Sequence, residues 1–225
     1  MIKLQNITKN YNISNAESIL ALNNISLTFK EGELIILKGA SGSGKSTILS
    51  LIAGLQKPTS GEVIVDKKRI SKLTDDFSSL YRRENIGFVF QKYNLIPNLS
   101  VKENIILPLI PNNIDENLLQ TKLNKIMEKF NIEHKENILV KNLSGGEQQR
   151  VAIARAHINN PKIILADEPT ANLDKVLSEN FISILRELKN SNKTIIIATH
   201  DPIFFNLDIV DKTINIQNGQ ILLCS

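Results

Sequence analysis

A glycine-rich stretch, residues 39–47, is where this sequence most clearly carries chemistry. Its spacing Gly39-x-x-x-x-Gly44-Lys45-Ser46 follows a short apolar run and precedes a helix-like pattern, which is the strand–loop–helix setting of a P-loop. Loop N–H groups and a helix start favour a polyphosphate, whose charge Lys45 would neutralise while Ser46 binds Mg²⁺. A glycine-rich turn without a ligand is the alternative. The pattern predicts a nucleotide in contact with Gly39, Ala40, Ser41, Gly42, Ser43, Gly44, Lys45, Ser46 and Thr47.

Two carboxylates, Asp167 and Glu168, end an apolar run that starts at Lys162. Side chains alternate along a strand, so the two acids point differently and can act differently. Asp167 suits Mg²⁺, usually through water, and Glu168 suits the activation of an attacking water; a solvated strand end is the alternative. His200 follows the strand expected over 193–199. It could contact a γ-phosphate or the attacking water, although a lone histidine is more often structural.

A second helix start, at Ser144, also has features that favour an anion. Ser144 and Glu147 form a capping-box pattern around Gly145 and Gly146, although glycine is disfavoured in a helix by about 1 kcal/mol against alanine. Glycines here would let an anion approach the free N–H groups of the helix. The chain therefore carries two candidate phosphate-binding helix N-termini, far apart in the sequence.

Tyr11 and Gln91 each have a functional and a structural interpretation. Tyr11 lies in a polar stretch, expected to be a loop between two strands, where it could stack on a base or be a partly buried anchor. Gln91 follows the strand expected over 86–90, at the sheet edge where α/β proteins bind ligands, or it is a surface amide. Spacing alone leaves these alternatives open.

Apolar periodicity predicts the elements that position these residues. Further strands are expected over 2–7, 25–29 and 62–66, and a hairpin over 213–223 turns at Asn218-Gly219. Helices are expected after the P-loop, over 151–157 and over 177–188. Residues 97–117, which contain Pro97, Pro108 and Pro111, are expected to be loop with short turns. A helix from Glu116 has a stripe that packs in the core or faces a partner, formed by Leu119, Leu123, Ile126, Met127 and Phe130.

Composition limits the protein class. The 225 residues are 42% hydrophobic and 22% charged, which is ordinary for a globular protein with a real core. A net charge of +4 suits an anionic cofactor or an anionic lipid face, or is only a solvated surface, and does not by itself indicate nucleic-acid binding. One cysteine excludes a disulfide framework and suits a reducing cytosol. Neither a secretory signal nor a membrane-spanning run is found, so action at a membrane requires a partner.

The motifs together make the chain similar to the nucleotide-binding domain of ABC transporters over its whole length. The resemblance implies an α/β P-loop core with a mostly parallel sheet, plus an antiparallel β subdomain and a helical subdomain at about 92–150, within one domain, 1–225. It assigns Leu143–Arg150 to the signature motif, Ile163–Glu168 to the Walker B strand and catalytic glutamate, Asn172-Leu173-Asp174 to the D-loop, Gln91 to the Q-loop, His200 to the switch histidine and Tyr11 to the adenine-stacking aromatic.

The same resemblance implies a mechanism. Two copies pack head to tail on ATP and Mg²⁺, and the first turn of one signature helix contacts the γ-phosphate held by the other P-loop; its residues are Ser144, Gly145, Gly146 and Glu147. The expected metal ligands are Ser46, Gln91 and Asp167. Glu168 polarises the water, which His200 and Gln91 sense or position. The dimer would drive an integral membrane permease from the cytoplasmic face, as a peripheral subunit without a nucleic-acid partner.

Residues 82–91, 94–97, 103–104 and 107–109 resemble one group within the family, the lipoprotein-releasing, macrolide-efflux and peptide-antibiotic-resistance ATPases. This implies export or extrusion of lipoprotein, drug or peptide. Ala171, where these relatives usually have glycine, and a short segment over 111–116 depart from the group. A cell-division-type ATPase that signals to wall hydrolases and the ATPase of an importer remain alternatives. The ABC-type ATPases of DNA repair need insertions for which 225 residues with one cysteine leave no room.

Overall fold

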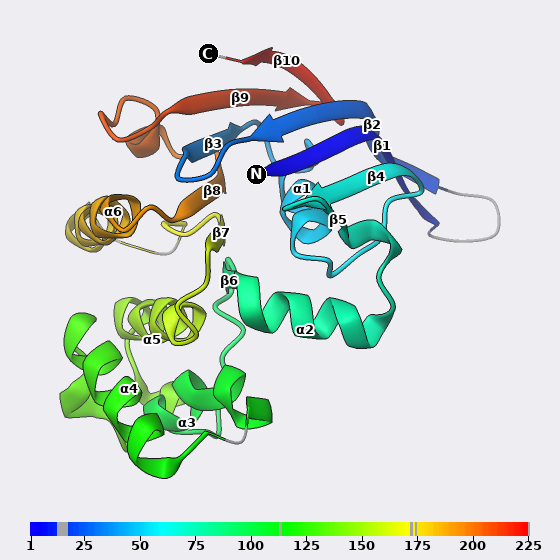
Figure 1. Cartoon of the computed structure of the whole chain (residues 1–225). Helices are drawn as coiled ribbons and strands as arrows, with labels where there is room; N and C mark the ends of the chain where they lie inside the picture. The colour runs from blue at the N-terminus through cyan, green and yellow to red at the C-terminus, as the bar shows by residue number, and fades with distance from the viewer. Residues whose placement is uncertain (13–17, 113, 172, 174, 225) are drawn as a thin grey trace.

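The computed structural model describes residues 1–12, 18–112, 114–171, 173 and 175–224 and contains two β-sheets with helices around them (Figure 1). The smaller sheet has the strand order β2-β1-β4-β5, and the larger sheet has the order β10-β9-β3-β8-β7-β6. The smaller sheet is antiparallel, and the larger one is parallel except for β10. The predicted class, an α/β core with a mostly parallel sheet and a separate antiparallel sheet, is confirmed.

The parallel strands are short, nearly continuous apolar runs, as expected for strands covered on both faces. The larger sheet consists of β3 (Leu34–Lys38), β6 (Ile86–Val89), β7 (Ile163–Asp167), β8 (Thr194–Thr199), β9 (Lys212–Gln217) and β10 (Gln220–Cys224). The predicted hairpin joins β9 to β10, where Asn218 and Gly219 have φ of 49° and 72°, as a type I′ turn requires. Because β3, β6, β7 and β8 run in one direction, their carboxyl ends meet at the same edge.

The antiparallel sheet extends further than the sequence pattern predicted. It consists of β1 (Ile2–Asn12), β2 (Ser18–Phe29), β4 (Ser60–Val65) and β5 (Lys68–Arg69). Tyr11 pairs with Ile19 in the β1–β2 ladder, so the prediction that Tyr11 lies in a loop is wrong. Ladder hydrogen bonds form whatever the side chains are, and at this end of the sheet even Ile19 and Leu20 are exposed, so the strand shows no burial pattern to read.

Helix α1 (Lys45–Ile52) holds the P-loop in place because its apolar side chains are fully buried. Ile48, Leu49, Leu51 and Ile52 belong to one core cluster with residues of both sheets, and none is more than 1% exposed. Burial of each such side chain stabilises the fold by about 2 kcal/mol. Helix α2 (Asp75–Asn85) packs beside β6, and α6 (Lys175–Asn190) packs beside β8.

The segment between β6 and β7 is helical and lies in the lower half of Figure 1. It contains α3 (Val101–Ile106), the 3₁₀ turn η2 (Leu107–Asn112), α4 (Glu116–Lys129), two further 3₁₀ turns (Glu133–Lys135 and Val140–Asn142) and α5 (Gly145–His157). The helix predicted from Glu116 is confirmed. Its apolar stripe packs in the core, with Leu123, Ile126, Met127 and Phe130 buried.

The expectation of loop over 97–117 is wrong, because α3 and η2 lie there. Ser100 accepts a hydrogen bond from the Glu103 N–H at 3.3 Å, and Glu103 accepts one from the Ser100 N–H at 2.7 Å. This capping box starts a helix. The sequence contains this pattern as Ser-x-x-Glu, but Pro108 and Pro111 after it favoured the prediction of a loop. Among the described residues, no helix is both long and apolar enough to cross a membrane.

Candidate nucleotide and metal site

Lys45 is the buried cation of the P-loop. Its side chain is 4% exposed, and its Nζ donates to the carbonyl oxygens of Gly39 (2.8 Å) and Ala40 (3.0 Å). The N-cap of α1 is Gly44 at φ 107°, a conformation that only glycine adopts at little cost. Within the described part of the chain, α1 has no side-chain cap and no acidic residue in its first turn. The first N–H groups of α1 can therefore bind an external anion.

The P-loop also contains a buried hydroxyl that lacks a partner. Ser43 Oγ makes no hydrogen bond within the described residues, although its carbonyl accepts from the Gly219 N–H at 3.0 Å. Buried polar groups are nearly always hydrogen-bonded, so such an atom indicates a missing partner. Neighbouring Ser41 and Gly42 are exposed, and an added Cβ on Gly42 would meet no atom within 4 Å. The hydroxyl of Ser43, unpartnered among the described residues, and the open space at Gly42 both fit a loop that receives phosphate oxygens.

Asp167, the last residue of β7, accepts a hydrogen bond from Ser46 Oγ at 2.9 Å. Burial raises the pKa of Asp167 against the hydrogen bond from Ser46, which lowers it. A hydroxyl beside a carboxylate is a donor set that fits Mg²⁺, which keeps its other positions for water and phosphate. Among the described residues, no group of three or more His, Cys, Asp and Glu could hold a metal by itself. The residues present therefore fit a magnesium ion that arrives with a polyphosphate.

Glu168 has a φ of 44°, which is uncommon for a residue with a long side chain. Its N–H donates to the Ala198 carbonyl at 2.8 Å. Its Oε2 accepts from Thr199 Oγ1 (3.0 Å) and from the His200 N–H (3.3 Å). Its Oε1 lies 2.8 Å from His200 Nδ1 and 3.6 Å from Lys45 Nζ. The carboxylate is therefore fixed from β8 and faces the P-loop lysine.

The structure thus brings five of the predicted site residues into one chain of contacts. Ser46 contacts Asp167, the next residue is Glu168, and Glu168 contacts both Lys45 and His200. The two acids do point differently, since Asp167 meets the hydroxyl of the P-loop and Glu168 meets its lysine, but strand alternation is not the cause, because β7 ends at Asp167 and Glu168 has a positive φ. Their assignment to metal and to water remains a prediction.

Tyr11 reaches the P-loop helix from β1. Its hydroxyl donates to Gln56 Oε1 (2.5 Å) and lies 3.4 Å from Thr47 Oγ1. The Nζ of Lys9 lies 5.0 Å from the centroid of its ring. Tyr11 is half-buried. It is therefore a partly buried anchor, as one interpretation held, and its place beside the P-loop helix keeps base stacking as a prediction.

Gln91 lies in the turn after β6, at the same sheet edge, and is exposed. Its role as a metal ligand remains a prediction. Of the predicted D-loop, Asn172 and Asp174 lie outside the described residues, and Leu173 donates its N–H to the Thr170 carbonyl at 3.0 Å.

The start of α5 is not brought to the P-loop; it lies in the lower, helical half of Figure 1, whereas α1 lies in the upper half. Ser144 Oγ accepts from the Glu147 N–H (3.4 Å), and Glu147 Oε2 accepts from the Ser144 N–H (2.8 Å). The N–H of Ser144 lowers the pKa of Glu147 to about 2, helped by Lys135. The predicted capping box is confirmed, and the side chain of Glu147 occupies it.

The two glycines of α5 differ in their surroundings. Gly145 is exposed, but Gly146 is buried, and an added Cβ there would lie 2.4 Å from Leu177 Cδ1. Close packing against α6 therefore favours glycine at position 146, because an added Cβ would have to displace the end of the Leu177 side chain. Contact of an anion with Gly145 and Gly146 remains a prediction, and only Gly145 is exposed in the single chain.

Four polar residues beside the site were not singled out in the sequence. Thr199, Thr170 and Asp201 are hydrogen-bonded around Glu168, and the buried Gln149 of α5 donates to the Pro169 carbonyl. A signal existed for Thr199, a polar residue that ends the apolar β8 next to His200. Gln149 lies within the predicted signature motif, but its partner Pro169 and the partner of Thr170, Asp201, are distant in the sequence, so no local pattern indicates these contacts.

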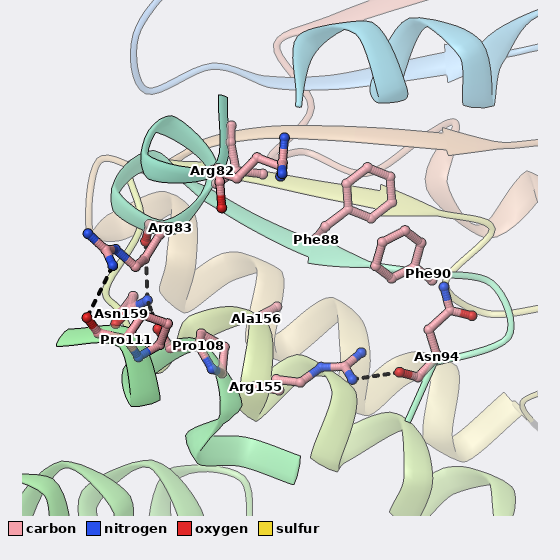
Figure 2. A pocket seen from close by; sticks show the side chains of 12 residues that line it. Arg82, Arg83, Phe88, Phe90, Asn94, Pro108, Pro111, Arg155, Ala156 and Asn159 are labelled. Carbon is pink, nitrogen blue, oxygen red and sulfur yellow. Dashed lines mark hydrogen bonds between the residues drawn. The ribbon is translucent and has the colours of Figure 1, made fainter. Parts of the chain in front are cut away.

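A cavity of about 410 Å³ lies between the helical segment and the core (Figure 2). Phe88 and Phe90 stack along it with ring centroids 4.2 Å apart. Arg155 donates to the carbonyls of Asn94 and Tyr93 (both 2.6 Å). Arg82 and Arg83 of α2 also line the cavity, with Ser79, Ile86, Pro108, Pro111, Ala156 and Asn159. The lining of the cavity thus combines two stacked phenylalanine rings with three arginine side chains.

The fold and the site define a P-loop ATPase. The family model "ABC transporter" matches residues 22–171. The chain belongs to the ABC transporter family, as one of its ATP-hydrolysing, ATP-binding cassettes.

Individual relatives cover nearly the whole chain. An ABC transporter ATP-binding protein of Methanocaldococcus jannaschii, MJ0796, is 47% identical over 89% of this chain and 87% of its own. Its dimeric structure in a post-hydrolysis state, bound to ADP and Pi, superposes with a TM-score of 0.93 at 41% identity and covers 100% of this chain and 98% of that one. The lipoprotein-releasing system ATP-binding protein LolD of Wigglesworthia glossinidia brevipalpis is 38% identical over 98% of this chain and 96% of its own. The macrolide export protein MacB of Salmonella choleraesuis is 37% identical over 99% of this chain and 34% of its own.

Proposed function

We propose that this chain binds ATP with Mg²⁺, dimerises on it and hydrolyses it to drive a separate membrane permease. The observation that carries the proposal is the single contact chain formed by Lys45, Ser46, Asp167, Glu168 and His200. Each of these residue types has a distinct task in phosphoryl transfer to water, and the fold delivers them from three strand ends to one point.

Each residue has a defined task in the reaction. Lys45 exchanges the carbonyls of Gly39 and Ala40 for phosphate oxygens, which also frees Glu168 Oε1 from its ion pair. Ser46, Asp167 and Gln91 would hold the magnesium ion, which neutralises charge on the phosphates when bound. Glu168 accepts a proton as the water oxygen bonds to the γ-phosphorus and the bond to the ADP oxygen breaks. His200 keeps Glu168 oriented and contacts the γ-phosphate.

The second copy would supply the start of α5. Ser144, Gly145, Gly146 and Glu147 lie away from the P-loop of their own chain, so they can meet a γ-phosphate only on a partner. The dimeric MJ0796 structure with ADP and Pi supports this arrangement. A triphosphate would then join two copies, and hydrolysis would let them separate.

Glu168→Gln tests the assignment of the base. The amide keeps the shape and accepts no proton, so this variant should bind ATP, accumulate a dimer and lose at least about 100-fold in turnover. Asp76→Asn, at an exposed carboxylate on α2, is the matched control. Wild-type turnover by Glu168→Gln would refute the assignment.

We further propose that the cavity of Figure 2 receives a short cytoplasmic segment of the permease. Its stacked phenylalanines and three arginines fit a segment that combines an apolar side chain with a carboxylate. Ile96 and Ile110, close by in the sequence, are 44% and 62% exposed. Exposed apolar residues in the segments that line this cavity favour a docking face.

Phe90→Asp tests the docking face, since a carboxylate there would repel an acidic segment. We expect loss of permease copurification with ATPase activity of the isolated chain retained. Phe77→Asp is the matched control, because Phe77 is 62% exposed on α2 and does not line the cavity. Equal loss of copurification in both variants would contradict the proposal.

The transported class proposed is a lipoprotein, drug or peptide that is exported or extruded, with the chain held peripherally at the cytoplasmic face of the cell membrane. The likeness to LolD and MacB supports export. A pull-down from native membranes with Glu168→Gln in ATP tests it. A four-helix subunit with a large extracytoplasmic domain is expected. A many-helix permease with a binding protein would indicate an importer, and cell-wall hydrolase regulators would indicate the cell-division type.

A further inference from the structure

A ring of hydrogen bonds joins the ends of β7 and β8 at Glu168. Thr199 Oγ1 donates to Glu168 Oε2 at 3.0 Å and accepts from the Asp201 N–H at 3.0 Å. Asp201 Oδ2 accepts from Thr170 Oγ1 at 2.7 Å. Thr170 is linked to Glu168 through Pro169, which closes the ring. Beyond the last paired residues of the two strands, Asp167 and Ala198, this ring continues the connection between them.

The proton of Thr199 has one defined direction in this ring. A backbone N–H can only donate, and an ionised carboxylate can only accept. Since Asp201 N–H donates to Thr199 Oγ1, the single hydroxyl proton is directed at Glu168 Oε2. Hydrogen bonds to an ionised acceptor are about twice as strong as neutral ones. Thr199 therefore fixes Oε2 and leaves Oε1 as the oxygen that faces Lys45.

Among the side chains that contact Glu168, those of Thr199 and Lys45 are buried and that of His200 is largely exposed. Thr199 is 0% exposed, whereas the side chain of His200 is 66% exposed. Lys45, the third partner, is needed by the phosphates once they bind. The hydroxyl of Thr199 has no such competing task.

Glu168 needs to be held because its backbone is strained. A φ of 44° is unfavourable for a residue that carries a side chain, and such strain persists only where the surroundings fix it. The ring is itself anchored, because Asp201 Oδ1 accepts from the Ile203 N–H at 3.0 Å and so caps the turn η5 (Pro202–Phe204). Thr170, at 4% exposure, anchors the other side.

We propose that Thr199 is a positioning residue of the hydrolytic site, whose hydroxyl holds Glu168 Oε2 and whose own position is fixed by Asp201 and Thr170. The inference rests on the proposed role of Glu168 as the group that activates water. Catalytic groups must be held within about half an ångström of their working position, and small displacements reduce rate far more than binding.

The experiment compares Thr199→Val, which keeps the shape and removes the hydroxyl, with Thr199→Ser, which keeps the hydroxyl. Thr199→Val should lower kcat about 10-fold or more, with the Kd for MgATP within about 3-fold of wild type. Thr199→Ser should restore kcat to within about 3-fold. Thr170→Val, which loosens the ring without touching Glu168, should give a smaller loss of kcat and serves if Thr199→Val does not fold.

Three results would overturn the proposal. These are wild-type kcat in Thr199→Val, equal loss in Thr199→Ser and Thr199→Val, and a parallel loss of MgATP binding and kcat in both, which would mark a merely structural role. Failure of the proposed function looks different. In that case the wild-type protein would show no turnover, or Glu168→Gln would turn over ATP like wild type.

Discussion

The two helix N-termini that the sequence marks as anion sites, those of α1 and α5, are built in opposite ways. At α1 the cap is Gly44, no side chain caps the helix among the described residues, and the buried Lys45 is adjacent. At α5 the cap is Ser144, and the carboxylate of Glu147 already accepts from its N–H. In the described part of the chain, the N-terminus of α1 is therefore uncapped and lies beside a cation, whereas the N-terminus of α5 is capped by the carboxylate of Glu147.

This difference indicates which start can bind a phosphate unaided. The open start of α1 offers N–H groups and a lysine beside Asp167 and Glu168, so it can bind a triphosphate in a single chain. At α5 an anion must approach a helix start that already carries negative charge, which makes a weak site by itself. We infer that α5 contributes only when a partner's P-loop already holds the phosphate.

The largest expected effect is at α1. Lys45→Ala removes the buried cation, and because each hydrogen bond to a charged group contributes about 1.5 to 3 kcal/mol, MgATP affinity should fall roughly 100-fold. Isothermal titration calorimetry measures this. Lys125→Ala, at an exposed lysine of α4, is the control and should bind as wild type. Wild-type MgATP affinity in Lys45→Ala would contradict the claim that the N-terminus of α1 binds phosphate more strongly than that of α5.

The glycines of α5 give the next largest effect. Gly146→Ala places a Cβ 2.4 Å from Leu177 Cδ1, so overpacking should lower the free energy of unfolding by about 1 to 3 kcal/mol. Gly145→Ala should not lower it, since alanine favours the helix. Urea unfolding distinguishes them, and adding Leu177→Ala should relieve Gly146→Ala. Equal destabilisation by both glycine substitutions would show that the packing argument is wrong.

The smallest effect concerns the acid that closes α5. The pKa of Glu147 is lowered to about 2 in the folded chain, from an ordinary value near 4.5. The unfolded chain therefore binds the proton first, and the stabilisation present above pH 4.5 is lost as the pH falls towards 2. Because Glu147 is partly exposed, we expect about 1 to 2 kcal/mol.

Glu147→Gln should remove this part of the pH dependence when unfolding free energies are compared at pH 6 and pH 3. Glu128→Gln, at an exposed glutamate of α4, is the control and should leave it in place. An unchanged pH dependence in Glu147→Gln would mean that the acid does not close the helix start.

Local patterns predicted what depends on local sequence. The apolar run of β3, the glycines of the P-loop and the Ser144–Glu147 capping box each fix their own backbone within a few residues, so motif and structure agree. The strand segment that contains Tyr11 was not predicted, because it is held by backbone pairing with β2 and its side chains show no alternating burial pattern. Helix α3 was not predicted, because Pro108 and Pro111 favoured a loop although Ser100 and Glu103 form a capping-box pattern.

Contacts between distant residues could not be predicted. Gly146 packs against Leu177 of another helix, and Thr199 meets Glu168 only because β7 and β8 are neighbours in the sheet. Neither pairing leaves a trace in the spacing of either residue. The sequence therefore predicted which residues meet at the site, and it did not predict the residues that hold Glu168 in place.

The most direct test of the division between α1 and α5 is sedimentation velocity, with nucleotide and protein absorbance recorded together. Glu168→Gln should bind MgATP and sediment as a dimer. Adding Ser144→Arg, which blocks the start of α5, should leave MgATP bound but the protein monomeric. Continued dimerisation would contradict the claim that the start of α5 contacts the nucleotide of the partner. Loss of MgATP from the monomer would contradict the claim that the start of α1 binds MgATP within its own chain.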